Sequence, residues 1–346
     1  MDFKQATAQE AEDWMETIGE KPYRARQVRS WVFTKGVSDF AQMTDLSKSF
    51  RETIAHKAIV TQIKEVKRDV SVDGTIKFLF GLDDGNTIES VYMPGADRVT
   101  LCISTQVGCK LNCKFCLTGK NGFMRNLSSA EIVDQLIQVK NRVPGGRVTN
   151  IVLMGMGEPL DNYDATVKAL RIFTEPDLNL IGGRKITLST AGVAPAIVRL
   201  ADDFSKVKLA ISLNAPTNEK RNQIMPINKK YPIETLMAAL KKWPLPHGRR
   251  ITFEYVMLGG FNDSDADAAE LGKITRLVPS KINLIPYNPC PGLPFERPST
   301  ERVEKFRSAL IKNHHTVTVR ESRGGDILAS CGQLRQAVKE APSSTP

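Results

Sequence analysis

The chain has 346 residues, of which 41% are hydrophobic and 25% are charged, a length and composition typical of a soluble globular protein with a substantial core. No apolar run is long enough to cross a membrane, and the first residues lack the apolar stretch of a signal peptide, so we expect a cytoplasmic protein with no membrane contact. The net charge of +10 favours a polyanionic partner without deciding for one. In a reducing compartment, six cysteines indicate metal ligands or reactive thiols rather than structural disulfides.

Residues 1–92 are predicted to form a small accessory domain in which helices precede a β-ribbon. The expected helices lie near 7–18, 22–34 and 45–57, and the expected strands near 62–68, 75–80 and 87–92. Arg26 and Arg29 are three residues apart in the second helix and would share one face. That face is either solvated or an RNA contact, and the pattern favours neither.

From Val99 onward, short apolar runs alternate with amphipathic segments. We expect strands at 99–105, 150–154, 185–190, 207–213, 251–257, 281–286 and 316–320, with helices near 128–142, 163–174, 193–202, 232–242, 264–277 and 299–313. Ser128 and Glu131 form a capping box that predicts the start of the first of these helices. The alternation predicts an α/β fold whose parallel sheet is a complete or partial barrel. We assign 93–340 to this domain and 341–346 to a disordered polar tail.

Basic residues concentrate between Ala215 and Glu254, where eight Lys or Arg stand against three Glu. This stretch is the best candidate for a surface that follows a chain of phosphate groups. Charge alone says nothing more about the partner.

Cys109, Cys113 and Cys116 follow the first strand of the second domain with C-x3-C-x2-C spacing. Three thiolates at this spacing can bind three irons of a [4Fe-4S] cluster and leave the fourth iron open. The open iron can chelate the amino and carboxylate groups of S-adenosylmethionine (SAM), which the reduced cluster then splits to a 5'-deoxyadenosyl radical. A zinc site is the alternative, but zinc requires four closed ligands, and no second Cys or His pair follows at zinc-site spacing. The spacing therefore favours a radical SAM centre.

Several polar residues lie where the following strands end, at the edge where such barrels collect their catalytic groups. Glu158, in the glycine-rich run 155–159 after the second strand, could accept a hydrogen bond from the SAM ammonium group. Ser189 and Ser212 end the third and fourth strands and could contact the carboxylate and ribose, while Asn288 could recognise adenine. Taken singly, these residues are more often helix caps, strand ends or turns.

Three cysteines lie outside the C-x3-C-x2-C run: Cys102 on the first strand, Cys290 between two prolines, and Cys331 near the carboxyl end. A small buried thiol is the usual meaning of a lone cysteine. From the residues alone, all three would be structural.

Five motifs in order change that interpretation: the three clustered cysteines, Gly155-Met-Gly-Glu-Pro159, Met225-Pro-Ile-Asn-Lys-Lys-Tyr231, Ile282-Asn-Leu-Ile-Pro286 and Cys331-Gly-Gln-Leu334. With them, the chain resembles the RlmN group of radical SAM adenine-C2 RNA methyltransferases from about residue 22 to 338. The resemblance implies a partial (βα)6-type radical SAM barrel and an RNA-binding accessory domain. It also implies methylation of an adenosine of 23S rRNA at the peptidyl-transferase centre and of the tRNA adenosine beside the anticodon. Cfr-like enzymes, the sister group, methylate C8, but Pro159 and the run 323–326 look more like the C2 group.

The resemblance also assigns roles to individual residues. It implies that Cys331 is the methyl carrier and that Cys102 is the partner that releases the RNA by forming a disulfide. It implies that Glu89 is the base that removes the C2 proton. Without the resemblance, Glu89 would be interpreted as an exposed strand carboxylate. The implied SAM contacts are Gly157, Glu158, Ser189, Ser212, Leu213, Asn214 and Asn288. Many relatives have His where this chain has Asn214, and an amide cannot carry a proton. We further expect two SAM molecules per turnover, an electron donor such as flavodoxin or ferredoxin, and a monomer.

Two other interpretations remain open at this stage. The same radical machinery could act on C8 or on another substrate, as in the Cfr-like group. Alternatively, the chain could be a non-catalytic RNA-binding protein with structural zinc.

Overall fold

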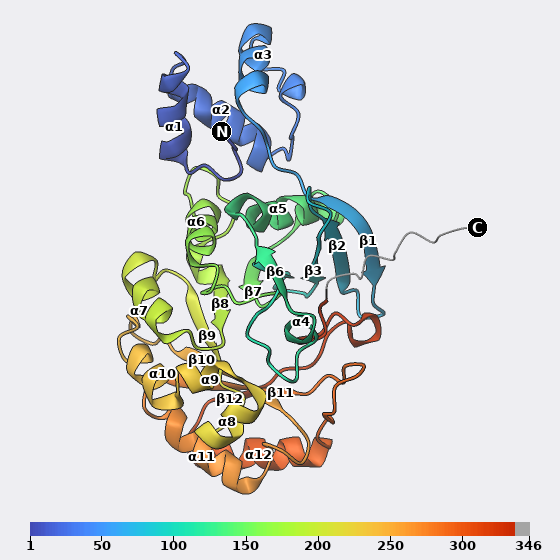
Figure 1. Cartoon of the computed structure of the whole chain (residues 1–346), viewed down its shortest axis with the longest axis vertical. Coiled ribbons are helices and arrows are strands. Elements are labelled where there is room, and N and C mark those ends of the chain that lie inside the picture. Colours follow the sequence, from blue (N-terminus) through green and yellow to red (C-terminus); the bar gives the residue numbers. More distant parts are fainter. Residues whose placement is uncertain (336–346) are drawn as a thin grey trace, which may run out of the picture.

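The computed structural model describes residues 1–335, and its main feature is one curved ten-stranded sheet with the order β1-β2-β3-β4-β7-β8-β9-β10-β11-β12. β1 and β12 are the two edges, so the sheet curves into an open rather than a closed barrel (Figure 1). The expectation of an α/β fold with a partial barrel is confirmed. The predicted tail at 341–346, and the end of the predicted second domain, lie outside the described residues.

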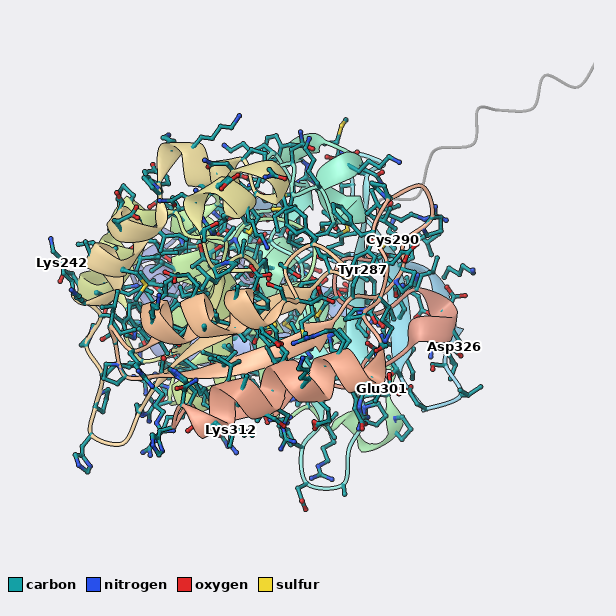
Figure 2. The ribbon with its side chains drawn as sticks, turned by 90° about the horizontal axis from the view of Figure 1, so that it is seen from below. Lys242, Tyr287, Cys290, Glu301, Lys312 and Asp326 are labelled. Atoms are coloured by element: carbon teal, nitrogen blue, oxygen red, sulfur yellow. The ribbon has the colours of Figure 1, made fainter. Side chains whose placement is uncertain are left out.

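Seven neighbouring strands of this sheet are parallel, as the alternation of apolar runs and amphipathic segments predicted. They are β4 (Thr100–Cys102), β7 (Asn150–Leu153), β8 (Ile186–Thr190), β9 (Lys208–Ser212), β10 (Ile251–Met257), β11 (Ser280–Pro286) and β12 (Val317–Val319). The long helices that connect them are α5 (Ser129–Lys140), α6 (Tyr163–Phe173), α7 (Ala194–Asp203), α10 (Ile233–Leu240), α11 (Asp265–Thr275) and α12 (Thr300–Lys312). The capping box of Ser128 and Glu131 is present at the start of α5. These helices cover the outer face of the sheet, and Figure 2 shows α12 between Glu301 and Lys312.

An antiparallel ribbon extends the barrel sheet at one edge. It consists of β1 (Lys64–Val70), β2 (Ile76–Gly81) and β3 (Thr87–Met93), close to the three strands predicted there. β3 also pairs with β4, with Val91 opposite Cys102. The sheet therefore continues without a break through the position where we placed the boundary between the two domains.

The N-terminal helices form a separate layer at one end of the molecule, in blue in Figure 1. They are α1 (Ala8–Thr17), α2 (Tyr23–Phe33) and α3 (Lys48–Lys57), with a short 3-10 turn at Phe40–Gln42. Arg29 of α2 is buried and bonds to the carbonyl of Ala6 and to Glu175, so it joins this layer to the barrel domain. Arg26 is exposed and pairs with Glu12. The idea that both arginines share a face that contacts RNA is therefore wrong for Arg29.

The elements that the sequence did not predict are all short, because three to seven residues carry too little periodicity to be recognised. They are the hairpin β5 (Gln106–Gly108) and β6 (Phe123–Asn126), helix α4 (Leu117–Lys120), the consecutive helices α8 (Asn218–Ile224) and α9 (Ile227–Lys230), and 3-10 turns at Pro144–Gly146, Gly183–Lys185 and Gly325–Ile327. The hairpin encloses the three-cysteine run, so one of the missed elements shapes the site.

The basic stretch between Ala215 and Glu254 does not form a uniform charged surface. Arg221 is fully buried and donates to the carbonyls of Leu213 and Ala191 and to the Asn228 side chain. Lys220 is held by both carboxylate oxygens of Asp267 at 2.7 and 2.8 Å. The exposed cations of the stretch include Lys229, Lys230, Lys241 and Lys242.

Within residues 1–335, no helix combines the length and the apolar composition that crossing a membrane requires.

We predict that the N-terminal layer depends on a buried ion pair between Lys4 and Asp134, whose side chains are 1% and 0% exposed. Asp134 also accepts hydrogen bonds from the Ile63 amide at 2.7 Å and from Gln138 at 3.2 Å. Asp134→Ala leaves the Lys4 ammonium buried without a counterion, so we expect a loss of about 3–5 kcal/mol in the free energy of unfolding, measured by urea denaturation.

Adding Lys4→Met to Asp134→Ala should recover part of this loss, because the unpaired charge is removed while the Ile63 amide still lacks its acceptor. The matched control is the exposed Asp177, whose change to alanine should alter the free energy of unfolding by less than about 0.5 kcal/mol. An Asp134→Ala protein as stable as that control would contradict the prediction.

Candidate active site

A cavity lies at the carboxyl end of the parallel strands, where the loops after successive strands meet. Its walls come from the three-cysteine run, the loop after β7, and the ends of β8 to β11, together with the C-terminal segment. The site residues from the sequence analysis that line it are Cys109, Cys113, Cys116, Gly157, Glu158, Ser189, Ser212, Asn214, Asn288 and Cys331. We call this cavity the cluster pocket.

The three clustered cysteines are positioned by the short hairpin on either side of them. Gly108 has a φ of +76°, and a Cβ at this position would lie 1.9 Å from the carbonyl of Gly122, so only glycine allows β5 and β6 to approach this closely. The Cys109 amide then donates to Gly122 at 2.8 Å, and the Leu117 amide, just after the run, donates to Gly332 at 2.8 Å. The cysteine run is thereby tied to the residue that follows Cys331.

The chemistry of these three thiols fits a metal cluster. The surrounding protein raises the pKa of Cys109 to about 12, and burial also raises the pKa of Cys113 and Cys116. Without a positive partner, such thiols stay protonated, whereas iron binding stabilises the thiolates. The three cysteines do not converge on a single ion: within residues 1–335, no three Cys, His, Asp or Glu side chains are close enough to surround one metal ion. They instead line the wall of the larger cluster pocket.

The loop after β7 is fixed by its glycines and by Glu158. A Cβ on Gly157, where φ is +100°, would lie 2.5 Å from the Gln106 side chain, and Gln106 accepts the Glu158 amide at 2.9 Å. The Glu158 carboxylate accepts the amides of Ala191 at 2.7 Å and Leu160 at 3.1 Å. Burial raises its pKa to about 7, although these hydrogen bonds favour the charged form. Since Glu158 lines the pocket, its carboxylate could also accept a hydrogen bond from an ammonium group there.

The expected SAM contacts of the next two strands divide into those that face the pocket and one that does not. Ser189 and Ser212 line it together, with their hydroxyls 3.4 Å apart. Leu213 is not among the lining residues, because its side chain is fully buried in the main core. Successive residues at the end of β9 point to opposite sides, and the role of Leu213 as a SAM contact stays a prediction.

Asn214 and Asn288 line the pocket but are already hydrogen bonded to protein. The Asn214 oxygen accepts the Val256 amide at 2.9 Å, and its φ of +58° is one that asparagine tolerates better than most residues. The Asn288 oxygen accepts from the Ser322 hydroxyl and, at 3.4 Å, from Arg297. The amide nitrogen of Asn288 remains as its donor toward a ligand.

Cys331 lies between the cluster pocket and a second cavity of about 620 Å³ inside the barrel, which we call the lumen. Cys102 lines the lumen only, and its pKa is raised to about 12 by burial and by the nearby Cys331. The two lone cysteines that the resemblance pairs therefore face a common space. Cys290 does not: it lies beside Tyr287 in a small apolar cluster (Figure 2), with its thiol 3.3 Å from the Asn288 carbonyl.

Glu89 is buried on β3 and is not among the residues that line either cavity, so the expectation of an exposed carboxylate is wrong. Its side chain is 7% exposed, forms an ion pair with Lys77 at 3.1 Å and accepts the Arg335 amide at 2.8 Å. Burial raises its pKa because the desolvation cost exceeds the attraction of Lys77. Glu89 and Val91 are two residues apart on β3, and Val91 is opposite Cys102, so Glu89 faces the same side of the sheet as Cys102.

The C-terminal segment 320–335 lies across the open side of the sheet and fixes Cys331 from both sides. On the ribbon side, Asp326 accepts the Ser71 hydroxyl at 2.6 Å, and the Gly324 amide donates to Asp73 at 3.1 Å. On the cluster side, the Thr118 hydroxyl donates to the carbonyl of Leu334 at 2.7 Å. Long-range contacts thus hold both ends of the Cys331 turn.

Two cations of the site were not predicted from the sequence, the partly exposed Arg320 and the buried Arg221. Arg320 follows β12, lines both cavities, lies 4.0 Å from the buried Glu254, and has its pKa raised by the adjacent Cys331. Arg221 joins the ends of β8 and β9 by donating to the carbonyls of Ala191 and Ser212. The position of Arg320 at a strand end was a usable signal, whereas Arg221 was hidden among exposed lysines.

Comparison with known proteins agrees with this architecture. Residues 103–272 match the radical SAM superfamily, and residues 1–60 match the ribosomal RNA large subunit methyltransferase N-terminal domain. The dual-specificity RNA methyltransferase RlmN of Syntrophobacter fumaroxidans is 48% identical over 96% of this chain and 97% of its own. That of Geobacter sulfurreducens is 47% identical over 97% of this chain and 92% of its own.

A solved structure extends the likeness to three dimensions. The crystal structure of a radical SAM methyltransferase from Sphaerobacter thermophilus superposes with a TM-score of 0.92 at 45% identity, covering 97% of this chain and 99% of that one. The likeness includes the N-terminal helices, the ribbon and the barrel alike. On sequence identity and fold over nearly its whole length, this chain belongs to the RlmN family of radical SAM RNA methyltransferases.

Proposed function

We propose that this protein methylates C2 of adenosine in 23S rRNA at the peptidyl-transferase centre and in tRNA beside the anticodon. The observation that carries the proposal is the position of Cys331, which lines the cluster pocket on one side and the lumen with Cys102 on the other. An ordinary SAM methyltransferase needs no such pair of thiols. Adenine C2 is electron-poor and cannot attack a SAM methyl group itself, so a carrier that first takes the methyl group solves the chemical problem.

The cluster pocket would hold both cofactors. Cys109, Cys113 and Cys116 would bind a [4Fe-4S] cluster, and Gly157, Glu158, Ser189, Ser212, Asn214 and Asn288 would surround SAM. When bound, these groups supply methyl transfer and hydrogen-abstracting radical chemistry, with two SAM molecules used per turnover. Glu158 would orient the ammonium group, and the Asn288 amide nitrogen is free to meet the adenine ring.

The protein's own residues carry the RNA part of the reaction. Cys331 takes a methyl group on its sulfur as a thiolate, and Arg320 lines the same two cavities. Once the radical chemistry that the bound cofactors would supply has removed a hydrogen atom from this methyl group, the thioether carbon bonds to C2 and joins the RNA to the protein. Glu89 removes the C2 proton, and Cys102 attacks the Cys331 sulfur, which releases methylated RNA and leaves a Cys102–Cys331 disulfide.

The remaining partners follow from this chemistry. We propose a cytoplasmic monomer that receives single electrons from a small donor such as flavodoxin or ferredoxin. The N-terminal helices, with the exposed lysines of 215–254, would contact the RNA phosphates. Because the target is a nucleobase in folded RNA, the base has to leave its stack to reach Cys331.

Mass spectrometry of the nucleosides from treated RNA tests the function. We expect 2-methyladenosine after incubation of anaerobically prepared protein with SAM, a reductant and either unmethylated 23S rRNA or tRNA. 8-Methyladenosine would instead assign the chain the chemistry of the sister group. Stoichiometric zinc without iron or sulfide in the same preparation would exclude the radical mechanism.

We predict opposite outcomes for the two lone cysteines of the reaction. Cys331→Ala should abolish methylation, because no sulfur remains to carry the methyl group, while iron and sulfide content stay as in the wild type. Cys102→Ala should accumulate a covalent protein-RNA adduct, visible as a shifted band on a denaturing gel. Cys290→Ala is the matched control, since this thiol lies outside both cavities, and it should keep activity. A fully active Cys331→Ala protein would refute the mechanism.

We predict that Glu89→Gln lowers the methylation rate by about 10²–10⁴-fold, the usual contribution of a general base, and also accumulates the adduct. Methylation of Cys331 itself, measured on the peptide by mass spectrometry, should be unaffected. Since burial raises the pKa of Glu89, wild-type activity should fall as pH is lowered through a range above the ordinary glutamate pKa, where the base becomes protonated. An adduct-free Glu89→Gln protein with wild-type rate would remove Glu89 from this role.

A further inference from the structure

The lumen differs from the usual interior of a parallel barrel, which is filled by layers of branched apolar side chains. Here the side chains that point inward from the strands are largely polar: Thr100, Asn150, Thr187, Thr252, Asn283 and Thr318. They leave a cavity of about 620 Å³, within the size range of small-molecule sites. Cys102 and Cys331 both line it. The interior of this barrel is therefore a largely polar cavity that reaches the thiol pair.

Basic side chains surround the lumen at the amino ends of the strands. Lys208 begins β9, Lys281 is the second residue of β11, and Arg98 lies just before β4; all three line the cavity. Partial burial lowers the pKa of Lys208, and repulsion from neighbouring cations lowers it further. These cations are Lys281, Arg98, Lys185 and Arg249. In the described part of the chain, none of these cations forms an ion pair with an acidic side chain. Unpaired like charges at one opening favour an anion there.

We propose that the lumen admits a small anionic thiol, which enters past Arg98, Lys208 and Lys281 and reduces the Cys102–Cys331 disulfide after each turnover. The inference rests on the proposed function, because that reaction oxidises the pair once per methylated RNA. Cys109, Cys113 and Cys116 would be ligands, and Cys290 faces neither cavity, so none of the other four thiols of the chain can restore the pair.

Cys331 is partly exposed, and it is the burial of Cys102 that argues for a small molecule rather than a protein reductant. Cys102 is only 7% exposed and lies on a central strand of the sheet, so a protein dithiol cannot bring its own sulfur into contact with it. The other approach to Cys331 leads through the cluster pocket, which the cluster and SAM would fill. The lumen provides a route from the opposite end of the strands.

The exchange is balanced by two thiols of the reductant. The first thiolate attacks the Cys102 sulfur, the Cys102–Cys331 bond breaks, and Cys331 leaves as a thiolate beside the Arg320 guanidinium before it is protonated. The second thiol attacks the mixed disulfide, releases the oxidised reductant as its own disulfide, and returns Cys102 to the thiol. Two electrons and two protons pass to the cysteine pair.

Reducing agents of different charge test the proposal on the protein that holds its cluster and SAM, in the absence of RNA. Protein carrying the Cys102–Cys331 disulfide, formed with diamide and verified by peptide mass, is reduced with 2-mercaptoethanesulfonate, 2-mercaptoethanol or cysteamine, and new thiols are counted by alkylation. We expect Lys208→Glu/Lys281→Glu to slow the anionic thiol about ten-fold relative to the wild type, with no slowing of the cationic thiol. Raising the ionic strength should reduce the difference between the wild type and this variant in the rate of reduction by the anionic thiol.

Matched variants keep the test independent of folding and of net charge. Lys208→Gln/Lys281→Gln should give a smaller slowing of the same sign. Lys21→Glu/Lys57→Glu makes the same charge change on exposed residues of the N-terminal layer and should leave all three rates unchanged. Reduction rates that respond equally to both double charge reversals would overturn the proposal.

Two further measurements separate the possible failures. If no Cys102–Cys331 disulfide forms when the wild type methylates RNA, the proposed function fails. If the disulfide forms but its rate of reduction does not depend on the charge of the thiol, only the lumen proposal fails. RNA affinity is measured on the same variants. We expect it to be unchanged by Lys208→Glu/Lys281→Glu, and a loss that matches the loss in reduction rate would assign these cations to RNA phosphates instead.

Discussion

The position of Cys331 depends on how the C-terminal segment closes the open side of the sheet. β1 and β12 are unpaired edges, and the segment 320–335 bridges them through hydrogen bonds between residues about 250 positions apart in the chain. Ordering such a long loop costs conformational entropy, which several hydrogen bonds and the contact with the cysteine run together offset. Because both ends of the turn are fixed, one sulfur reaches two cavities.

Burial and a few placed cations control the chemistry of the site. Desolvation raises the pKa of Cys102, Glu89 and Glu158, which keeps these groups protonated more readily than in water. Lys77 opposes this effect at Glu89, and Arg320 opposes it at Cys102. The resulting balance suits residues that must exchange protons during a reaction, whereas a fully solvated carboxylate or thiol would have a fixed state near neutral pH.

The sequence predicted the long elements well because each has a strong period or a local cap. The helix expected at 128–142 is α5, Ser129–Lys140, and its capping box is present. Charge patterns were less informative, because the sequence does not show whether a Lys or Arg is exposed or buried. Arg29 and Arg221 looked like surface cations, but the first pairs with Glu175 inside the molecule and the second bonds to three backbone carbonyls.

The sequence by itself determined the cofactor class, the order of strands and helices, and the residues that gather at one end of the sheet, because ligand spacing and strand ends are local properties. Only the tertiary structure decided that Glu89 is buried, that Leu213 faces the core, and that Cys102 and Cys331 share a chamber with a basic opening. These facts depend on sheet register, on the curvature of the barrel and on contacts between distant segments. Such contacts arise from the packing of the whole chain, so no short stretch of residues encodes them.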